Sequence, residues 1–161
     1  MKTIRADVFE TNSSSTHSLA ISVKPLEPSL YLSEDSKYHI SFRDFEGDTE
    51  QITWISEKIA FLLQLSMQCR GYYYYSDSEI DLLDREEEYE ELYDLPLFKQ
   101  IETTLRLYNP ECQGLVVDDL RGHIDHQTLL EYHSGEAFLA DFNMSLADYL
   151  FGNVILLADH D

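Results

Sequence analysis

Carboxylate side chains are concentrated in one short segment of this chain, residues 77–94. Within this segment, ten acidic residues accompany a single basic residue, Arg85. The whole chain is also acidic, with a formal net charge of −20 over 161 residues. An acidic surface repels nucleic acid and attracts the basic surfaces of proteins that bind nucleic acid. The sequence therefore predicts a basic protein partner and no direct binding to nucleic acid.

The spacing of these acids suggests how they could be arranged. If the segment is helical, intervals of four, three, four and three residues place five carboxylates on one stripe. The five are Asp77, Asp81, Asp84, Glu88 and Glu91. Neighbours on such a stripe lie about 5–6 Å apart, which is comparable to the interval between successive phosphates of one DNA strand. We therefore predict that the stripe presents phosphate surrogates to a groove lined by Arg and Lys.

Aromatic residues within the same segment favour a protein interface over a purely solubilising surface. Tyr89 and Tyr93 lie among the acids, and residues 72–75 are four consecutive tyrosines. Because large aromatic side chains supply contact area at interfaces, Tyr89 and Tyr93 are predicted to act as anchors. The alternative is a solvated acidic loop, since like charges at helical spacing oppose a helix by roughly 0.2–0.5 kcal/mol per pair.

A second group of residues could support metal or hydrolytic chemistry. His123 and His126 are three positions apart, so on a helix both could reach one divalent ion. The possible partners in this site are Asp118, Asp119 and His17. A lone HxxH pattern has low specificity, however, and Gly122 just before it favours a turn. A metal-dependent hydrolase or nucleotide-processing enzyme is therefore the alternative. The sequence predicts a protein that is not an enzyme and that needs no metal or cofactor.

Helices and strands that could position these residues follow from the apolar pattern. Apolar residues recur at intervals of three and four over about 49–69 and 97–108, which predicts two main helices. Short apolar or alternating runs predict strands at 19–23, 38–42, 115–117 and 154–157. We therefore expect an α+β fold with a small, mostly antiparallel sheet packed with these two helices. Residues 1–161 are expected to form a single compact domain, in which 77–94 is an acidic helix or loop inserted for interaction.

Composition restricts the cellular setting. No apolar run approaches the roughly 20 residues that are needed to cross a bilayer, so no membrane association is predicted. Cys69 and Cys112 lie far apart and lack a CxxC partner, which is typical of an intracellular chain with reduced thiols. We therefore expect a protein of the cytoplasm. The sequence gives no prediction of the oligomeric state.

The segment Arg5 to Ser18, RADVFETNSSSTHS, resembles an N-terminal signature of small, mostly uncharacterised proteins from bacterial phages and mobile elements. Residues 124–127, IDHQ, and 152–155, GNVI, are also similar to that group. The resemblance implies an origin rather than an activity, and it implies that the cytoplasm in question is that of a bacterial host. The acidic segment 77–94 has no counterpart in this resemblance.

Phages and mobile elements must disarm host enzymes that bind their DNA, and small acidic inhibitors, including anti-CRISPR proteins, are similar to this chain in charge and length. We therefore expect an inhibitor of a host nucleic-acid-binding defence enzyme, with the nuclease of a type II CRISPR system as its target. The acidic stripe would then act as a DNA mimic in the cleft that reads the duplex beside the target. A phage structural or assembly protein is the other alternative.

Overall fold

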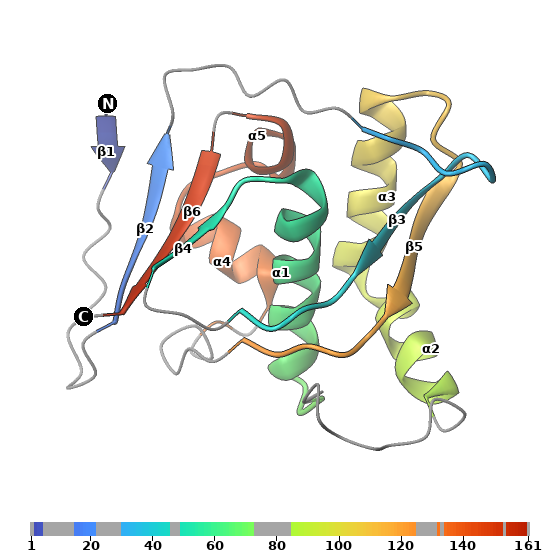
Figure 1. Ribbon diagram of the computed structural model, residues 1–161, viewed down its shortest axis with the longest axis horizontal. Helices are drawn as coiled ribbons and strands as arrows, with labels where there is room; N and C mark the ends of the chain where they lie inside the picture. Colours follow the sequence, from blue (N-terminus) through green and yellow to red (C-terminus); the bar gives the residue numbers. More distant parts are fainter. Residues whose placement is uncertain are drawn as a thin grey trace.

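The computed structural model describes residues 2–4, 15–21, 30–45, 49–72, 85–124, 132, 134–152 and 154–160. Within these residues the chain forms six strands and five helices (Figure 1). The strands are β1 (Lys2–Ile4), β2 (Ser15–Ile21), β3 (Lys37–Ser41), β4 (Thr49–Ile52), β5 (Gly114–Asp119) and β6 (Val154–His160). The helices are α1 (Ile55–Gln68), α2 (Glu86–Asp94), α3 (Pro96–Tyr108), α4 (Gly135–Asp141) and α5 (Leu146–Phe151).

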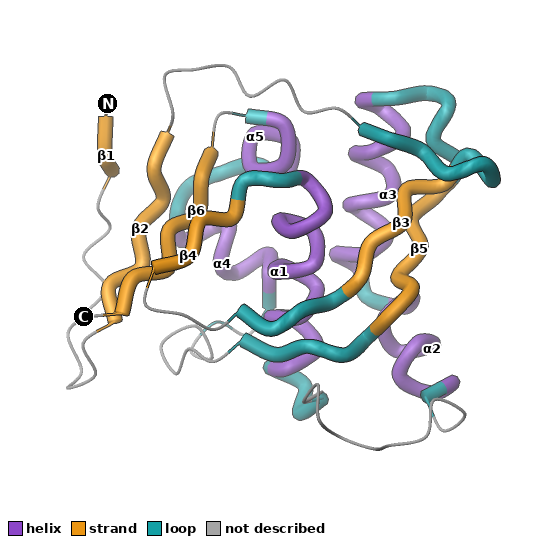
Figure 2. Tube along the Cα trace, viewed as in Figure 1, coloured by secondary structure: helices purple, strands orange, loops and turns teal. Residues whose placement is uncertain are grey.

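The strands belong to two separate sheets. One sheet has four antiparallel strands in the order β1-β2-β6-β4, and the other is the parallel pair β3–β5. Figure 2 shows the four-stranded sheet at the left and the parallel pair at the right, with α1 between them. Helix α1 packs on β3, and α3 packs on β5. The central helix therefore has structured neighbours on several sides.

The fold expected from the sequence is wrong in its sheet and in its helices. A single, mostly antiparallel sheet packed with two main helices was predicted, whereas the strands beside α1 and α3 form a parallel pair and five helices occur among the described residues. Parallel strands need a long crossover, and here the connection from β3 to β5 includes α1, α2 and α3. Apolar alternation in one strand does not reveal the direction of its partner, so the sequence could not show this pairing.

The start of α1 differs from the prediction as well. Residues 49–52 form strand β4 rather than the first turn of a helix over 49–69, and α1 begins at Ile55. The Glu57 carboxylate accepts hydrogen bonds from the backbone N–H groups of Thr53 and Trp54, both at 3.4 Å, which fixes the N-terminus of the helix. In contrast, the helix predicted over 97–108 corresponds closely to α3, which begins with Pro96 in its first turn.

Helix α1 is buried almost all round, and its polar side chains bind the backbone of neighbouring segments. Gln64 Nε2 donates to the Arg43 carbonyl oxygen at 2.7 Å, and Gln64 Oε1 accepts from the Arg43 N–H at 3.2 Å. One turn later, Gln68 makes the same pair of bonds with Ile124, at 3.2 and 2.8 Å. These bonds hold two neighbouring chain segments, in which Phe45 and Ile124 form a parallel bridge, against the helix. Backbone groups that would otherwise be buried without partners are thereby satisfied.

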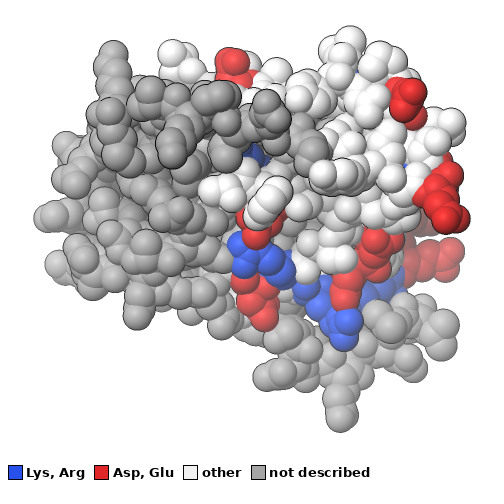
Figure 3. Space-filling model, turned by 45° about the horizontal axis from the view of Figure 1, so that its top comes forward, with Lys and Arg blue, Asp and Glu red and all other residues white. Residues whose placement is uncertain are grey.

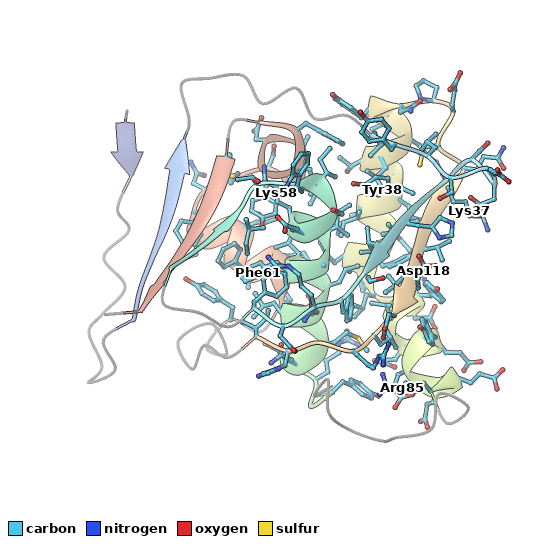
Figure 4. The ribbon with its side chains drawn as sticks, viewed as in Figure 1. Lys37, Tyr38, Lys58, Phe61, Arg85 and Asp118 are labelled. Carbon is cyan, nitrogen blue, oxygen red and sulfur yellow. The ribbon has the colours of Figure 1, made fainter. Side chains whose placement is uncertain are left out.

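The hydrophobic core is centred on α1. Phe61 is 1% exposed and makes edge-to-face contacts with Phe45 and Phe138, at centroid distances of 5.6 and 5.4 Å. Figure 4 shows Phe61 and Lys58 on this helix. Lys58 is also 1% exposed, and its ammonium group donates to the Tyr149 carbonyl oxygen of α5 at 2.8 Å. Among the described residues, no helix is both long enough and apolar enough to span a membrane.

Candidate binding surface

Helix α2 contains the acidic residues that the structure describes within the segment 77–94. Three glutamates occupy its first turn, where the partial positive charge of the helix N-terminus stabilises them. The helix ends at Asp94, and α3 begins two residues later at Pro96, because proline is well suited to the first turn of a helix and cannot continue one. Leu92 and Leu95 are buried in the core and fix α2 against the rest of the molecule.

One side of α2 is exposed and strongly acidic. Its carboxylates fall on two rows with a spacing of four residues, which places them side by side on the helix surface. These residues, Glu86, Glu87, Glu90, Glu91 and Asp94, are called here the acidic face of α2. Among the described residues, Glu86, Glu87 and Glu90 form no ion pair. Figure 3 shows acidic side chains at several separate places on the face that it draws, some of them beside Lys or Arg side chains.

The acidic face differs from the stripe predicted from the sequence. Asp77, Asp81 and Asp84 lie outside the described residues. Glu88 is half-buried on the side of α2 that packs inward, and its Oε2 atom is buried with no hydrogen-bond partner. Glu91 forms an ion pair with Arg70 at the end of α1. Of the two described members of the predicted stripe, Glu88 therefore faces inward and Glu91 is paired with a cation of the same chain. The burial of Leu92 sets the rotation of the helix that places them there.

The two tyrosines that the sequence predicted as anchors attach α2 to β5 and α3. The Tyr89 hydroxyl donates to the Asp118 carbonyl oxygen at 3.2 Å. The Tyr93 ring packs edge-to-face on Phe98 of α3, with a ring-centroid distance of 5.0 Å. Partial burial raises the pKa of both tyrosines. Tyr93 is nevertheless 37% exposed, so part of its ring remains on the surface beside the acidic face.

Most basic side chains of the described residues are engaged with acids or buried. Arg70 binds Glu91, Lys99 binds Asp94 at 3.2 Å, and Arg106 lies 3.6 Å from Glu102. Arg85, the single base of the acidic segment, is 2% exposed at the start of α2 and interacts electrostatically with Tyr89 and Asp119 (Figure 4). The acidic face is therefore only partly neutralised by the cations around it.

A histidine between two carboxylates lies close to the end of β5. His39 Nδ1 is 2.9 Å from Asp118 Oδ1, and His39 Nε2 is 3.1 Å from Asp35 Oδ2. Hydrogen bonding to Asp118, and then to Asp35, raises the pKa of His39 above its ordinary value of 6.5. Sequence analysis missed this cluster because its members are 4 and 79 residues apart.

His123 pairs with a residue that the sequence did not indicate. Its Nδ1 atom lies 2.9 Å from Asp44 Oδ1, and its backbone N–H donates to the same oxygen at 3.1 Å. Gly122 before it has a φ of 151°, and a Cβ atom there would lie 2.5 Å from the Arg43 backbone, so this close approach requires glycine.

The residues that the sequence grouped as candidate metal ligands go to different partners. Asp118 binds His39, and Asp119 forms a bidentate pair with Arg121, with distances of 2.5 to 3.0 Å. His126 lies outside the described residues. Within the described part of the chain, no group of three or more His, Cys, Asp or Glu side chains could hold a metal ion. A hydrolase using His123 and His126 stays a prediction.

The comparisons with known proteins give no relative. No family model matches the chain, and neither a curated protein nor a solved structure is significantly similar to it.

Proposed function

We propose that this chain binds a basic, nucleic-acid-binding protein through the acidic face of α2. The observation that carries the proposal is the exposure of Glu86, Glu87 and Glu90 without an ion pair among the described residues, in a chain with a net charge of −20. Exposed carboxylates at helical spacing can be reached together by the Arg and Lys side chains of one basic groove. The buried Leu92, the Tyr89 hydroxyl and the Tyr93 ring support this face from behind.

The proposed partner is a host defence enzyme, and specifically the nuclease of a type II CRISPR system. This choice rests on the size and charge of the chain and on the resemblance of residues 5–18 to proteins of phages and mobile elements. Such a nuclease reads its target in a basic cleft in which arginines contact the DNA groove. A protein that occupies this cleft blocks DNA binding without any chemical step. Long-range attraction would speed the encounter by roughly 10- to 1000-fold at low salt.

Neutralising two carboxylates of the acidic face tests the proposal. In the double variant Glu86→Gln/Glu90→Gln, the rate of association with a guide-loaded type II CRISPR nuclease should fall by about tenfold at low salt, because two unpaired charges of the face are lost. The dependence of this rate on salt should also become weaker. The free energy of unfolding should change by no more than about 0.5 kcal/mol, since both side chains are exposed. Surface plasmon resonance at several salt concentrations measures the rates.

A matched control removes the same charge elsewhere. Glu111 precedes β5 and Glu136 lies in the first turn of α4, both at least partly exposed, and the double variant Glu111→Gln/Glu136→Gln changes the net charge by the same amount. This control should retain an association rate close to that of the wild type. Equal losses in the two double variants would mean that net charge alone drives the encounter. If Glu86→Gln/Glu90→Gln associated at the same rate as the wild type, the acidic face would be excluded as the contact.

A further inference from the structure

The cluster of Asp35, His39 and Asp118 has a geometry that depends on a proton. Both ring nitrogens of His39 face carboxylates: Nδ1 lies 2.9 and 3.1 Å from the two Asp118 oxygens, and Nε2 lies 3.3 and 3.1 Å from those of Asp35. A neutral imidazole carries one N–H and would direct a lone pair at one of these carboxylates. The imidazolium ion donates from both nitrogens. The donor pattern of the imidazolium ion therefore matches this arrangement.

This cluster joins three parts of the fold. Asp35 belongs to the turn before β3 and His39 to β3. Asp118, which Figure 4 labels, belongs to β5. The Asp118 carbonyl oxygen accepts the hydrogen bond from the Tyr89 hydroxyl of α2. Asp118 therefore contacts both β3, through its side chain, and α2, the helix that carries the acidic face, through its carbonyl group.

We propose that Asp35, His39 and Asp118 form a proton-dependent clamp that stabilises the docking of α2 on β5. When His39 loses its proton, it keeps a hydrogen bond to one carboxylate and releases the other. Release of the Asp118 carboxylate frees its side chain from His39 of β3, so the Asp118 carbonyl group that accepts from the Tyr89 hydroxyl is held less firmly. The effect of the clamp on partner binding rests on the proposed function, whereas the clamp itself does not.

Other charged and titratable groups surround the clamp and contribute to its response. Electrostatic interactions connect Asp35 with Lys37 on β3, and Asp118 with Tyr89 and Tyr93 on α2. The remaining groups that act on these tyrosines are Arg85, Glu102 and Asp119, and Glu34 adjoins Asp35 in the turn. Within this set, the carboxylates outnumber the cations. A proton on His39 is therefore favoured by its surroundings.

The direction of the pH dependence follows from the two pKa shifts. The pKa of His39 is raised in the folded state. The contribution of protonated His39 to stability is therefore complete below pH 6.5, and it is lost as the pH rises through the raised pKa. The pKa of Asp35 is lowered, chiefly by its hydrogen bond with His39, so the contribution of Asp35 is lost only in acid, below 3.8. The clamp is thus closed in mildly acidic solution and opens on the alkaline side.

The test follows the imidazole resonances of His39 by NMR between about pH 5 and pH 9, assigned by their disappearance in His39→Gln. The pKa of His39 should exceed 6.5 in the wild type and move toward 6.5 in Asp118→Asn and Asp35→Asn, with the larger change in Asp118→Asn. Hydrogen exchange provides the second readout. Protection of the α2 amides, corrected for the intrinsic exchange rate, is measured at one pH below and one pH above the pKa of His39. In the wild type this protection should be lower at the higher pH. In His39→Gln it should be equally low at both.

The outcomes separate the clamp from the proposed function. A His39 pKa at or below 6.5 in the wild type would overturn the clamp, as would α2 protection that is independent of pH in the wild type. Poly-lysine serves as a basic probe of the acidic face, and its binding at low salt should weaken in Glu86→Gln/Glu90→Gln, which tests the proposed function independently of the clamp. If the two structural readouts respond to pH while poly-lysine fails to bind at any pH, the clamp stands and the proposed function fails.

Discussion

Replacing Phe61 with alanine should lower the free energy of unfolding by about 3–5 kcal/mol. The Phe61 side chain is 1% exposed in the centre of α1 and contacts the rings of Phe45 and Phe138. Its removal leaves a cavity between α1, α4 and the segment that contains Phe45, and close-packed neighbours refill such a space only partly. Urea unfolding followed by far-UV circular dichroism measures the change.

A matched aromatic control is Tyr31→Ala. Tyr31 is 80% exposed, so its removal should change the free energy of unfolding by no more than about 0.5 kcal/mol. If Phe61→Ala unfolded at the same urea concentration as the wild type, the packing of α1 described here would be incorrect. The position of the acidic face would then also be in question, because Arg70 near the end of α1 binds Glu91 of α2.

Replacing Lys58 with methionine should remove a rise of stability with pH. Burial lowers the pKa of Lys58 from 10.5 to about 8, since an ammonium ion is poorly solvated inside the protein. The unfolded chain therefore binds this proton more tightly than the folded chain does, and the cost to stability is complete below about pH 8. The cost disappears as the pH rises toward 10.5, which corresponds to a gain on the order of 3 kcal/mol.

The measurement is the difference in unfolding free energy between the wild type and Lys58→Met as the pH is raised from 7. This difference should increase with pH in favour of the wild type, because methionine has no proton to lose. At pH 7 the variant should be about as stable as the wild type, since relief from the buried charge offsets the loss of the hydrogen bond to the Tyr149 carbonyl. A difference that does not vary with pH would mean that Lys58 is hydrated in the folded protein.

Tyr149→Phe is the matched control for this experiment. The Tyr149 hydroxyl is fully buried and has no hydrogen-bond partner among the described residues, so its removal should be neutral or stabilising. The variant keeps both Lys58 and the carbonyl oxygen that Lys58 binds. It should therefore retain the rise of stability with pH, which Lys58→Met loses.

The sequence was most informative where one periodic pattern extended over several helical turns. The recurrence of apolar residues over 97–108 matches α3, and its buried side chains, Leu97, Phe98, Ile101 and Leu105, follow that pattern. The prediction over 49–69 failed at its start because the apolar Ile52 fits both a helical and an alternating pattern. Its first four residues pair with β6 instead, and the partner residues in β6 are more than 100 positions later in the chain. A local pattern carries no information about such a partner.

The candidate site shows the same division. Acidity of the segment 77–94 is a property of the residues themselves, and it is evident without coordinates. Which of its acids face outward depends on the rotation of α2, which Leu92 fixes by entering a core formed by distant elements. For this reason Glu88 packs inward, while Glu86 and Glu90 are exposed. The pairing of His39 with Asp118 and that of His123 with Asp44 likewise depend on segments that meet only in the folded chain.

The sequence by itself determined the charge of this protein, the extent of α3 and the concentration of carboxylates in one segment, because these follow from residue types and short-range periodicity. Only the tertiary structure decided the parallel pairing of β3 with β5, the burial of Lys58 and the set of acids that a partner can reach. The physical reason is that burial and strand pairing depend on contacts between residues that are distant in the chain, and each such contact is set by the packing of the whole core.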